Sequence, residues 1–225
     1  MVISKSKVLA GIKAGLYTGY DDPKLVFLQA LRKRGIQPQA IRNYILNLGI
    51  SETETTVDLE ILFSENRKLI DKIADRYMAV VEPISIDISE PVKKTGLKTA
   101  EIKYHPEKIQ TRKISVGNKI LISKCDFDSL KGKEIRLIDL FNVKLNKKST
   151  IVKNQEVTFD LKKIQWVGED SISLKIVTPE GRLNGIGEIG LGNLKPGDII
   201  QLLRIGFCRV DSVGKKNITV YFSHK

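Results

Sequence analysis

The sequence predicts a mainly β protein, with an N-terminal helical region followed by two antiparallel β-barrels. Three observations support this fold class. Helix start and stop signals lie in the first 80 of the 225 residues, residues 84–88 alternate strictly between apolar and polar, and the later apolar runs are short. Turn signals separate these runs, and many short strands at such spacing are typical of barrels.

The helical region is expected to contain a short N-terminal helix and three further ones. Residues 1–20 read as a loop followed by a short helix that glycines interrupt. A helix is predicted over 22–35, because an Asp-Pro pair suits its first turn and a glycine ends it. The second of these three helices is predicted over 38–49, again from a proline to a glycine. The third is expected over about 57–77.

The β region is expected to begin near residue 81, and no strong helical period follows. Strands are predicted at residues 84–88, 120–122, 135–138, 156–161, 172–177, 199–203 and 218–222.

The chain is strongly basic, and the excess charge lies mainly in the β region. The formal net charge is +12. Residues 1–80 contain 12 Lys and Arg against 9 Asp and Glu, or +3, which leaves +9 for residues 81–225. An excess of this size favours a polyanionic partner. The alternative is a lysine-rich surface without a specific partner.

Cysteine and histidine usage argues against disulfides and zinc. Cys125 and Cys208 are far apart in a lysine-rich chain, so we expect two reduced, buried thiols and an intracellular protein. His105 and His224 are the only histidines, and without a Cys/His cluster we expect no metal site. No apolar run is long enough for a membrane span.

A lysine-containing segment at the N-terminus could handle ATP. Small residues surround Lys5 in the run Ser4-Lys5-Ser6-Lys7, so a mobile loop could bring its ammonium to a pyrophosphate. Such a tetrapeptide also occurs by chance in solvated tails, and the glycine-rich phosphate loop of nucleotide hydrolases is absent. The segment therefore gains weight only from its context.

That context is a series of collinear blocks. They lie at residues 2–6, 17–23, 31–38, 40–45, 66–71, 76–80, 164–167 and 206–211. On these blocks the chain resembles the archaeal and eukaryotic-type glutamyl-tRNA synthetases, class I enzymes with the glutaminyl-tRNA synthetases as close relatives. Residues 2–6 resemble the family's KMSKS signature. Residues 35–43 are closer to the glutamyl form than to the glutaminyl form, although a glutaminyl enzyme remains an alternative.

The resemblance implies roles for individual residues. Lys5 would stabilise the transition state of adenylate formation, and Ser4 and Ser6 would shape the loop. Arg76 matches a family arginine that contacts the middle uridine of the anticodon. Gln201 and Arg204 match a pair that contacts the same base.

Several other residues are weaker candidates for tRNA contacts. Lys163 stands beside an aromatic residue and could contact phosphate, while Trp166 is expected in the core rather than stacked on a base. Arg112 is expected to contact backbone phosphate or to lie in solvent. His105 is expected to cap a turn. The basic residues 32–34 could grip the tRNA or end a solvated helix, and both interpretations stay open.

The resemblance also implies how the chain is organised. We expect the signature loop and the end of a catalytic domain at 1–22, a helical stem-contact region at 23–80, and the anticodon-binding double barrel at 81–225. The distal barrel is expected at roughly 107–163. The family's H-I-G-H signature is absent, so we expect the C-terminal part of a larger enzyme.

The full-length enzyme would use ATP and Mg²⁺ to activate glutamate and attach it to tRNA(Glu), and tRNA(Gln) is a further candidate partner. For this chain alone we expect no bound cofactor, no catalysis, no membrane contact, a monomer, and a cytoplasmic location. A freestanding tRNA- or RNA-binding module is the alternative from another class.

Overall fold

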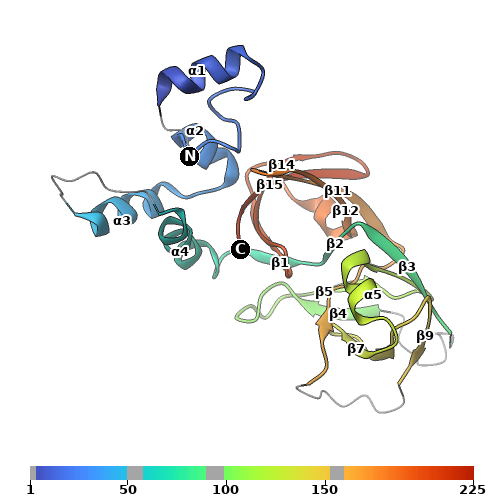
Figure 1. Ribbon diagram of the computed structural model, residues 1–225. Coiled ribbons are helices and arrows are strands. Elements are labelled where there is room, and N and C mark those ends of the chain that lie inside the picture. Colours follow the sequence, from blue (N-terminus) through green and yellow to red (C-terminus); the bar gives the residue numbers. More distant parts are fainter. Residues whose placement is uncertain (1–3, 50–57, 90–98, 153–159) are drawn as a thin grey trace.

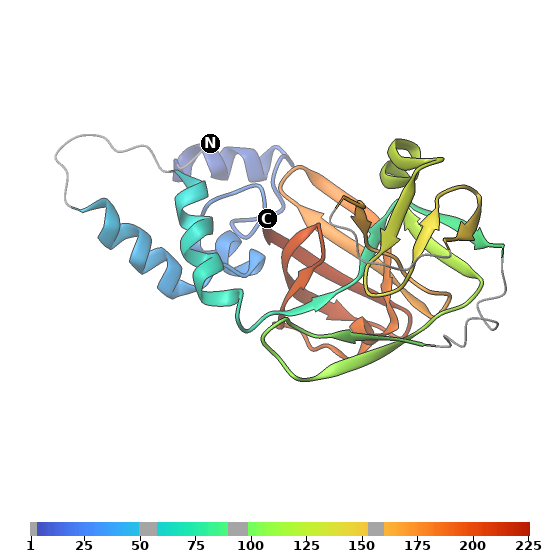
Figure 2. The ribbon, with the colours of Figure 1, turned by 90° about the horizontal axis from the view of Figure 1, so that it is seen from below.

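A computed structural model describes residues 4–49, 58–89, 99–152 and 160–225. Four helices form a region to one side of two curved β-sheets (Figures 1 and 2). They are α1 (Lys5–Lys13), α2 (Leu28–Arg34), α3 (Pro38–Leu48) and α4 (Leu59–Ile70). The mainly β fold with an N-terminal helical region is therefore confirmed.

The N-terminal signature is helical where the prediction had a loop. Ser4 is the N-cap residue of α1, and Lys5 and Ser6 occupy its first turn. Val8 anchors this helix in a small apolar cluster with Leu25 and Ala30. Residues 2 and 3 of the signature lie outside the described residues.

The helix predicted from residue 22 begins six residues later. The Asp22 carboxylate accepts hydrogen bonds from the backbone N–H groups of Thr18 and Lys24, at 2.9 and 3.0 Å, and so closes a turn. Burial alone would raise the pKa of Asp22, but these hydrogen bonds outweigh it and hold the pKa below its usual value. Gly35 ends α2 as predicted, with a left-handed φ of 90°.

The next two helices differ in how well they were predicted. The bounds of α3 match the prediction, although Ile45 on its apolar face is 59% exposed. The α4 helix is shorter than expected. Asp58 caps it by accepting from the Glu60 N–H at 2.9 Å, and residues 75–77 form a strand instead of its last turn.

Seven strands form the first sheet, here called the proximal sheet, in the order β1-β13-β14-β15-β11-β12-β2. Their bounds are β1 Asp75–Tyr77, β2 Ala79–Val81, β11 Ser171–Thr178, β12 Gly181–Glu188, β13 Ile199–Leu202, β14 Gly206–Val213 and β15 Asn217–His224. Only Met78 separates β1 from β2, yet these strands lie at opposite edges of the order. The sheet therefore curls until its two edges are adjacent, as in a nearly closed barrel.

Six strands form the second sheet, here called the distal sheet, in the order β10-β7-β8-β9-β3-β6. Their bounds are β3 Pro83–Ile88, β6 Lys119–Ser123, β7 Glu134–Leu137, β8 Asn142–Lys144, β9 Lys148–Ile151 and β10 Lys163–Ile164. Val167, just after β10, exchanges two backbone hydrogen bonds with Leu121 of β6 and so brings the edges together. The distal barrel was expected at roughly residues 107–163. The strand β3 of the distal sheet lies before that range.

Further elements complete the β region. The strands β4 (Thr99–Lys103) and β5 (Thr111–Ser115) pair as a hairpin, and α5 (Lys124–Leu130) is a helix that the sequence did not predict. Both sheets are mixed rather than purely antiparallel, because β1 pairs with β13, β11 with β15, β3 with β9 and β7 with β10 in parallel. Most of the predicted strand at 156–161 lies outside the described residues.

Each sheet encloses its own apolar core. Trp166 is fully buried in the distal core, and its indole N–H donates to the Ile138 carbonyl at 2.8 Å. Its expected core position is therefore confirmed. Cys208 lies in the proximal core, where burial raises the pKa of its thiol. Cys125 is exposed, so the prediction of two buried thiols is wrong for that residue.

The helical region docks on the end of the proximal sheet. The Arg34 guanidinium donates to the carbonyls of Phe222 and Ser223, at 3.1 and 2.5 Å. Asn66 of α4 contacts the His224 imidazole at 3.0 Å, and the Phe63 ring stacks on that imidazole with 5.3 Å between centroids. These contacts bury the end of β15 between the helices and the barrel.

The buried His224 makes this junction sensitive to pH. Burial lowers the pKa of His224; the Lys225 carbonyl opposes this shift, and the nearby Arg67 and Arg34 cations add to it. Unfolded histidine titrates near ~6.5, so below that pH the unfolded chain binds a proton that the folded chain does not.

We therefore expect the melting temperature to fall as the pH is lowered from about 6.5 to about 5, and to change little above about 7. Thermal unfolding followed by circular dichroism at several pH values measures this. His224→Gln should melt with a smaller pH dependence over the same interval. An equally steep dependence in that variant would assign the effect to other groups.

Candidate nucleic-acid interface

A groove lies where the proximal sheet, the distal sheet and the β4–β5 hairpin meet. It has a volume of about 610 Å³. Its lining residues are Arg76, Glu101, Ile102, Lys103, Pro106, Arg136, Ile138, Asp139, Leu140 and Leu203. Apolar side chains thus stand beside basic ones, a combination that suits a flat base carried on a phosphate backbone.

Strand register brings two of the predicted site residues together, and one of them, Arg76, lines this groove. The parallel pairing of β1 and β13 places Arg76 directly opposite Gln201. The Arg76 backbone N–H donates to the Tyr104 carbonyl at 2.6 Å, which joins β1 to the hairpin that forms another wall. The Arg76 Nη2 atom lies 3.3 Å from the Asp71 carboxylate.

Arg76 and Gln201 carry unsatisfied polar atoms. Of the side chains that the structure describes, three have a buried nitrogen or oxygen without a hydrogen-bond partner, at Arg76 Nε, Gln201 Oε1 and His105 Nε2. Buried polar atoms are normally paired because an unpaired one costs about 1–3 kcal/mol. The register pair therefore presents one unused donor and one unused acceptor.

The opposite wall of the groove is a loop of the distal sheet that the core supports. Asp139 adopts a left-handed φ of 53° between Ile138 and Leu140, both of which line the groove. Trp166 holds the Ile138 carbonyl, and the Ile138 N–H donates to the Ile164 carbonyl at 3.0 Å. The buried indole thus positions a wall of the groove, although it contacts no solvent.

Lys163 lies near this wall and remains exposed. The parallel pairing of β10 with β7 places it opposite Arg136, which lines the groove. Lys103 on β4 is exposed as well. Sequence reasoning missed Lys103, Arg136 and the loop at 138–140, because no local motif marks them and only the packing of the hairpin against the sheets brings them together.

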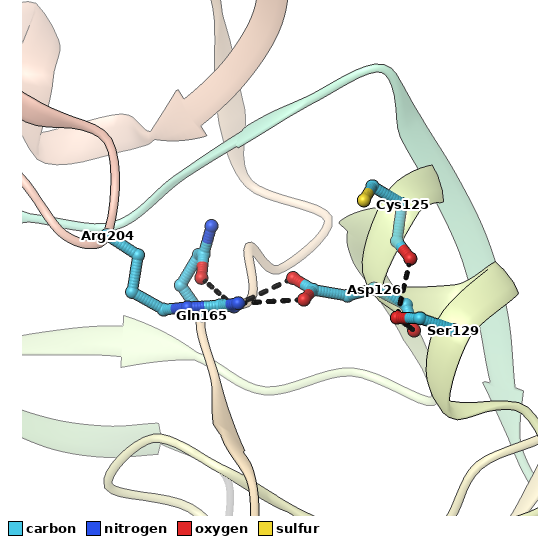
Figure 3. A network of polar contacts seen from close by, with 5 residues as sticks. All are labelled: Cys125, Asp126, Ser129, Gln165 and Arg204. Atoms are coloured by element: carbon cyan, nitrogen blue, oxygen red, sulfur yellow. Dashed lines mark hydrogen bonds and ion pairs between the residues drawn. The ribbon is translucent and has the colours of Figure 1, made fainter.

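Arg204 does not line the groove. It follows β13 with a left-handed φ of 62°, and its Nη1 and Nη2 atoms bind the two Asp126 carboxylate oxygens at 2.7 and 2.8 Å. Nη1 also donates to the Gln165 side-chain oxygen at 2.5 Å. Figure 3 shows the side chain reaching from its turn to α5. Of the two residues that the resemblance assigned to one base, Arg204 thus binds Asp126 and Gln165, whereas Gln201 lies opposite Arg76.

The prediction that Arg112 contacts phosphate or solvent is wrong. Its side chain is 7% exposed and pairs with Glu188, which is 2% exposed, through both carboxylate oxygens. The guanidinium also packs against the rings of Tyr77 and Tyr104, at 5.1 and 5.0 Å from their centroids, and these two rings contact each other edge-on. Burial and these contacts keep the guanidinium away from RNA in this structure. Its role is to hold the β4–β5 hairpin against the proximal sheet.

Two other expectations are resolved by the packing. The His105 Nδ1 atom accepts from the Glu107 N–H at 3.1 Å, so this histidine caps a turn as predicted. In the basic run 32–34, Arg34 is buried and Lys33 pairs with Asp21 at 2.6 Å, while Arg32 stays exposed. Only Arg32 fits the predicted solvated helix end.

The ATP-signature residues lie far from the groove. Ser4, Lys5 and Ser6 are exposed at the start of α1, and the two serine hydroxyls are 3.0 Å apart. Both views place α1 within the helical region, apart from the distal sheet (Figures 1 and 2). Within the described ranges, no group of three or more His, Cys, Asp or Glu side chains could hold a metal ion. No helix described by the structure is long and apolar enough to cross a membrane.

Two family models match the β region. Both carry the description "tRNA synthetases class I (E and Q), anti-codon binding domain", one over residues 74–163 and the other over residues 163–211. Together they cover every wall of the groove.

Curated relatives match along the whole chain. A glutamate–tRNA ligase of Methanosarcina barkeri is 38% identical over 234 residues, which cover 99% of this chain and 40% of the relative. The glutamate–tRNA ligase of Pyrococcus furiosus is 36% identical, with coverages of 100% and 41%. That of Sulfolobus acidocaldarius is 38% identical, with coverages of 100% and 40%. The chain therefore spans about two fifths of the length of these relatives.

Proposed function

Because this chain belongs to the class I tRNA synthetase family for glutamate and glutamine, we propose that it is the tRNA-binding part of a glutamate–tRNA ligase. The groove between its sheets receives a base of the anticodon. Its partner is tRNA(Glu), and it acts in the cytoplasm as a monomer. The relatives described above are all glutamate–tRNA ligases, which favours glutamate over glutamine.

The register pair of Arg76 and Gln201 carries this proposal. Arg76 lines the groove and carries an unused N–H donor, and its register partner Gln201 on the neighbouring strand carries an unused oxygen acceptor. A base that offers an acceptor next to a donor, as uracil does with O4 and N3–H, would satisfy both atoms. Single-stranded RNA is commonly read in this way, by hydrogen bonds to the pairing edges of splayed-out bases.

The rest of the groove fits the base and its backbone. Ile102, Leu140 and Leu203 offer apolar surface for the faces of a base. Lys103 and Lys163 are exposed near the groove, where they would meet phosphates. The +9 charge of residues 81–225 adds an attraction that salt weakens.

Arg76→Ala should weaken binding of a tRNA(Glu) transcript by about 1–3 kcal/mol, because a base contact in a partly buried site is lost. The loss should be smaller for a transcript whose middle anticodon base is changed. Filter binding of the 225-residue chain at several salt concentrations measures the affinity for both transcripts. Loss of a base contact leaves the salt dependence of the affinity unchanged.

Lys72→Ala is the matched control, since it removes one positive charge from an exposed position four residues before Arg76. If Arg76→Ala lost the same affinity for both transcripts, and its affinity depended less steeply on salt concentration, Arg76 would be a phosphate contact. A wild-type chain that binds the two transcripts equally well would contradict anticodon recognition.

In the whole enzyme, ATP and Mg²⁺ support the activation of glutamate. This chain contributes Lys5, with Ser4 and Ser6, to that site. Lys5 is exposed in the first turn of α1, where the helix dipole adds to the attraction of its ammonium for phosphate.

A further inference from the structure

We infer that a second pocket, between the helical region and the proximal sheet, is a docking site for an acidic, amphipathic segment of another protein. This α2–β14 pocket has a volume of about 400 Å³. Its walls are the end of α2, the start of α3 and the strands β13 and β14 (Figure 1). It shares no lining residue with the groove at Arg76. Docking here is therefore separate from the binding of tRNA at that groove.

The sequence block at residues 31–38 builds one wall of the pocket. Gly35 ends α2 and brings the chain close to the sheet, because a Cβ at this position would lie 2.9 Å from both the Arg209 Cβ and the Ile199 Cδ1. The chain then turns through the buried Ile36 into α3, which begins at Pro38. None of residues 31–38 lines the groove at Arg76, so RNA binding there leaves this wall without a role.

The pocket combines aliphatic surface with unpaired positive charge. Its aliphatic lining residues are Leu28, Ile36, Pro38, Ile41 and Ile199. Its charged lining residues are Arg32 and Arg209, and within the described ranges neither guanidinium has a hydrogen-bond or ion-pair partner. The helices α2 and α3 contain no Asp or Glu that could neutralise them. Complementary charge therefore favours a ligand that carries carboxylates beside apolar side chains.

An exposed apolar strip continues from the pocket along α3. Ile41, Ile45 and Leu48 follow the i, i+4, i+7 spacing of one helix face, and Ile45 and Leu48 are 59% and 40% exposed. Leu28, at the edge of the pocket, is 68% exposed. Apolar side chains gathered at the surface mark sites of protein interaction. An amphipathic segment would lay its apolar face along this strip and set its carboxylates against the two arginines.

Other occupants fit the pocket less well. None of its lining residues is aromatic, so it offers no ring on which an RNA base could stack. Among the described residues that line it, only Gln37 has an amide side chain, and its Nε2 atom already donates to the Gly35 carbonyl at 3.1 Å. A second copy of this chain is disfavoured by the net charge of +12, because like charges repel.

Fluorescence anisotropy of labelled peptides tests the docking site. The probe is a peptide of repeated Glu-Leu-Ala-Glu units, whose leucines recur about once per helical turn. One control peptide replaces Leu by Ser, and the other replaces Glu by Lys. The 225-residue chain should bind the probe more tightly than either control. Absence of binding, or equal affinity for the acidic serine peptide, would overturn the docking site, since the latter result needs only attraction between net charges.

Three variants locate the bound peptide. Arg209→Gln and Arg32→Ala each remove one charge from the pocket and should weaken binding of the probe by about two- to fivefold, as expected for an exposed charge pair. Ile45→Ser should also weaken it, because apolar contact along α3 is lost. Lys215→Ala is the matched control, since it removes one positive charge from an exposed position outside the pocket. Unchanged affinity in the three pocket variants, or an equal loss in Lys215→Ala, would overturn the site.

Two further measurements identify the other occupants. A tRNA(Glu) transcript should bind Arg209→Gln as tightly as it binds the wild type. Weaker binding with a smaller salt dependence would make Arg209 an RNA phosphate contact and would overturn the proposal. Sedimentation should give the same mass for the wild type and Ile45→Ser, whereas dissociation of a dimer by this substitution would make a second copy the occupant. If the wild type bound no transcript, the proposed function would fail while the peptide measurements still decided the docking site.

Discussion

Arg112→Met is expected to lower the free energy of unfolding by about 3–5 kcal/mol, because it leaves the buried Glu188 carboxylate without its charge partner. Arg112 bonds both oxygens of that carboxylate and also donates to the Lys103 carbonyl at 2.9 Å. Glu188 would keep only the Met78 N–H, at 3.0 Å. Methionine can still pack against the two tyrosine rings but donates no hydrogen bond. Urea denaturation followed by circular dichroism measures the loss.

Two further variants make this result specific. Lys113→Ala changes the next residue, which is exposed, and should shift the transition by less than about 0.5 kcal/mol. Arg112→Met combined with Glu188→Leu removes both charges and should regain much of the stability, since apolar replacements of buried ion pairs are often neutral. A small loss in Arg112→Met alone would show that the pair does not stabilise the fold.

Arg34→Met is expected to weaken the docking of the helical region on the barrel by roughly 2–3 kcal/mol. Arg34 is 4% exposed, and it donates to two carbonyls at the end of β15. Burial lowers the pKa of its guanidinium, so desolvation already offsets part of what those hydrogen bonds contribute. Methionine is similar in length but leaves both carbonyls without this donor.

Trp166, the only tryptophan, allows the effect to be localised. Its fluorescence reports on the distal core, whereas far-UV circular dichroism also reports on the helices. In Arg34→Met the helical signal should be lost at a lower urea concentration than in the wild type, with the tryptophan transition unmoved. Arg32→Ala, an exposed neighbour in the same helical turn, should leave both transitions in place. Equal shifts of both signals in Arg34→Met would contradict a separate docking contribution.

Local patterns predicted several of the longer elements, but they did not predict the eight-residue strands β12 and β14. Strict alternation located β3, and a proline and two glycines located the start of α3 and the ends of α2 and α3. The sequence did not reveal β10, with two residues, or β8, with three, because so few positions cannot display alternation. For the same reason α5, with seven residues, showed no helical period.

The site residues were predicted unevenly. Arg76 and Gln201 were found through the resemblance to the synthetases, but their adjacency comes from the parallel pairing of β1 with β13. The resemblance assigned Gln201 and Arg204 to the same base. The chain leaves β13 at Leu202, and the Arg204 side chain binds Asp126 of α5.

By itself the sequence determined the family, the succession of a helical region and a β region, and the basic character of the β region. These depend on composition, on short-range periodicity and on collinear motifs, all of which can be read along the chain. The tertiary structure alone decided which charged residues line the groove and which hold the protein together. Arg34, Arg112 and Arg204 look like surface cations in the sequence, since a free guanidinium prefers water. Each instead binds carbonyls or a carboxylate brought close by distant segments, and such partners exist only once the chain has folded.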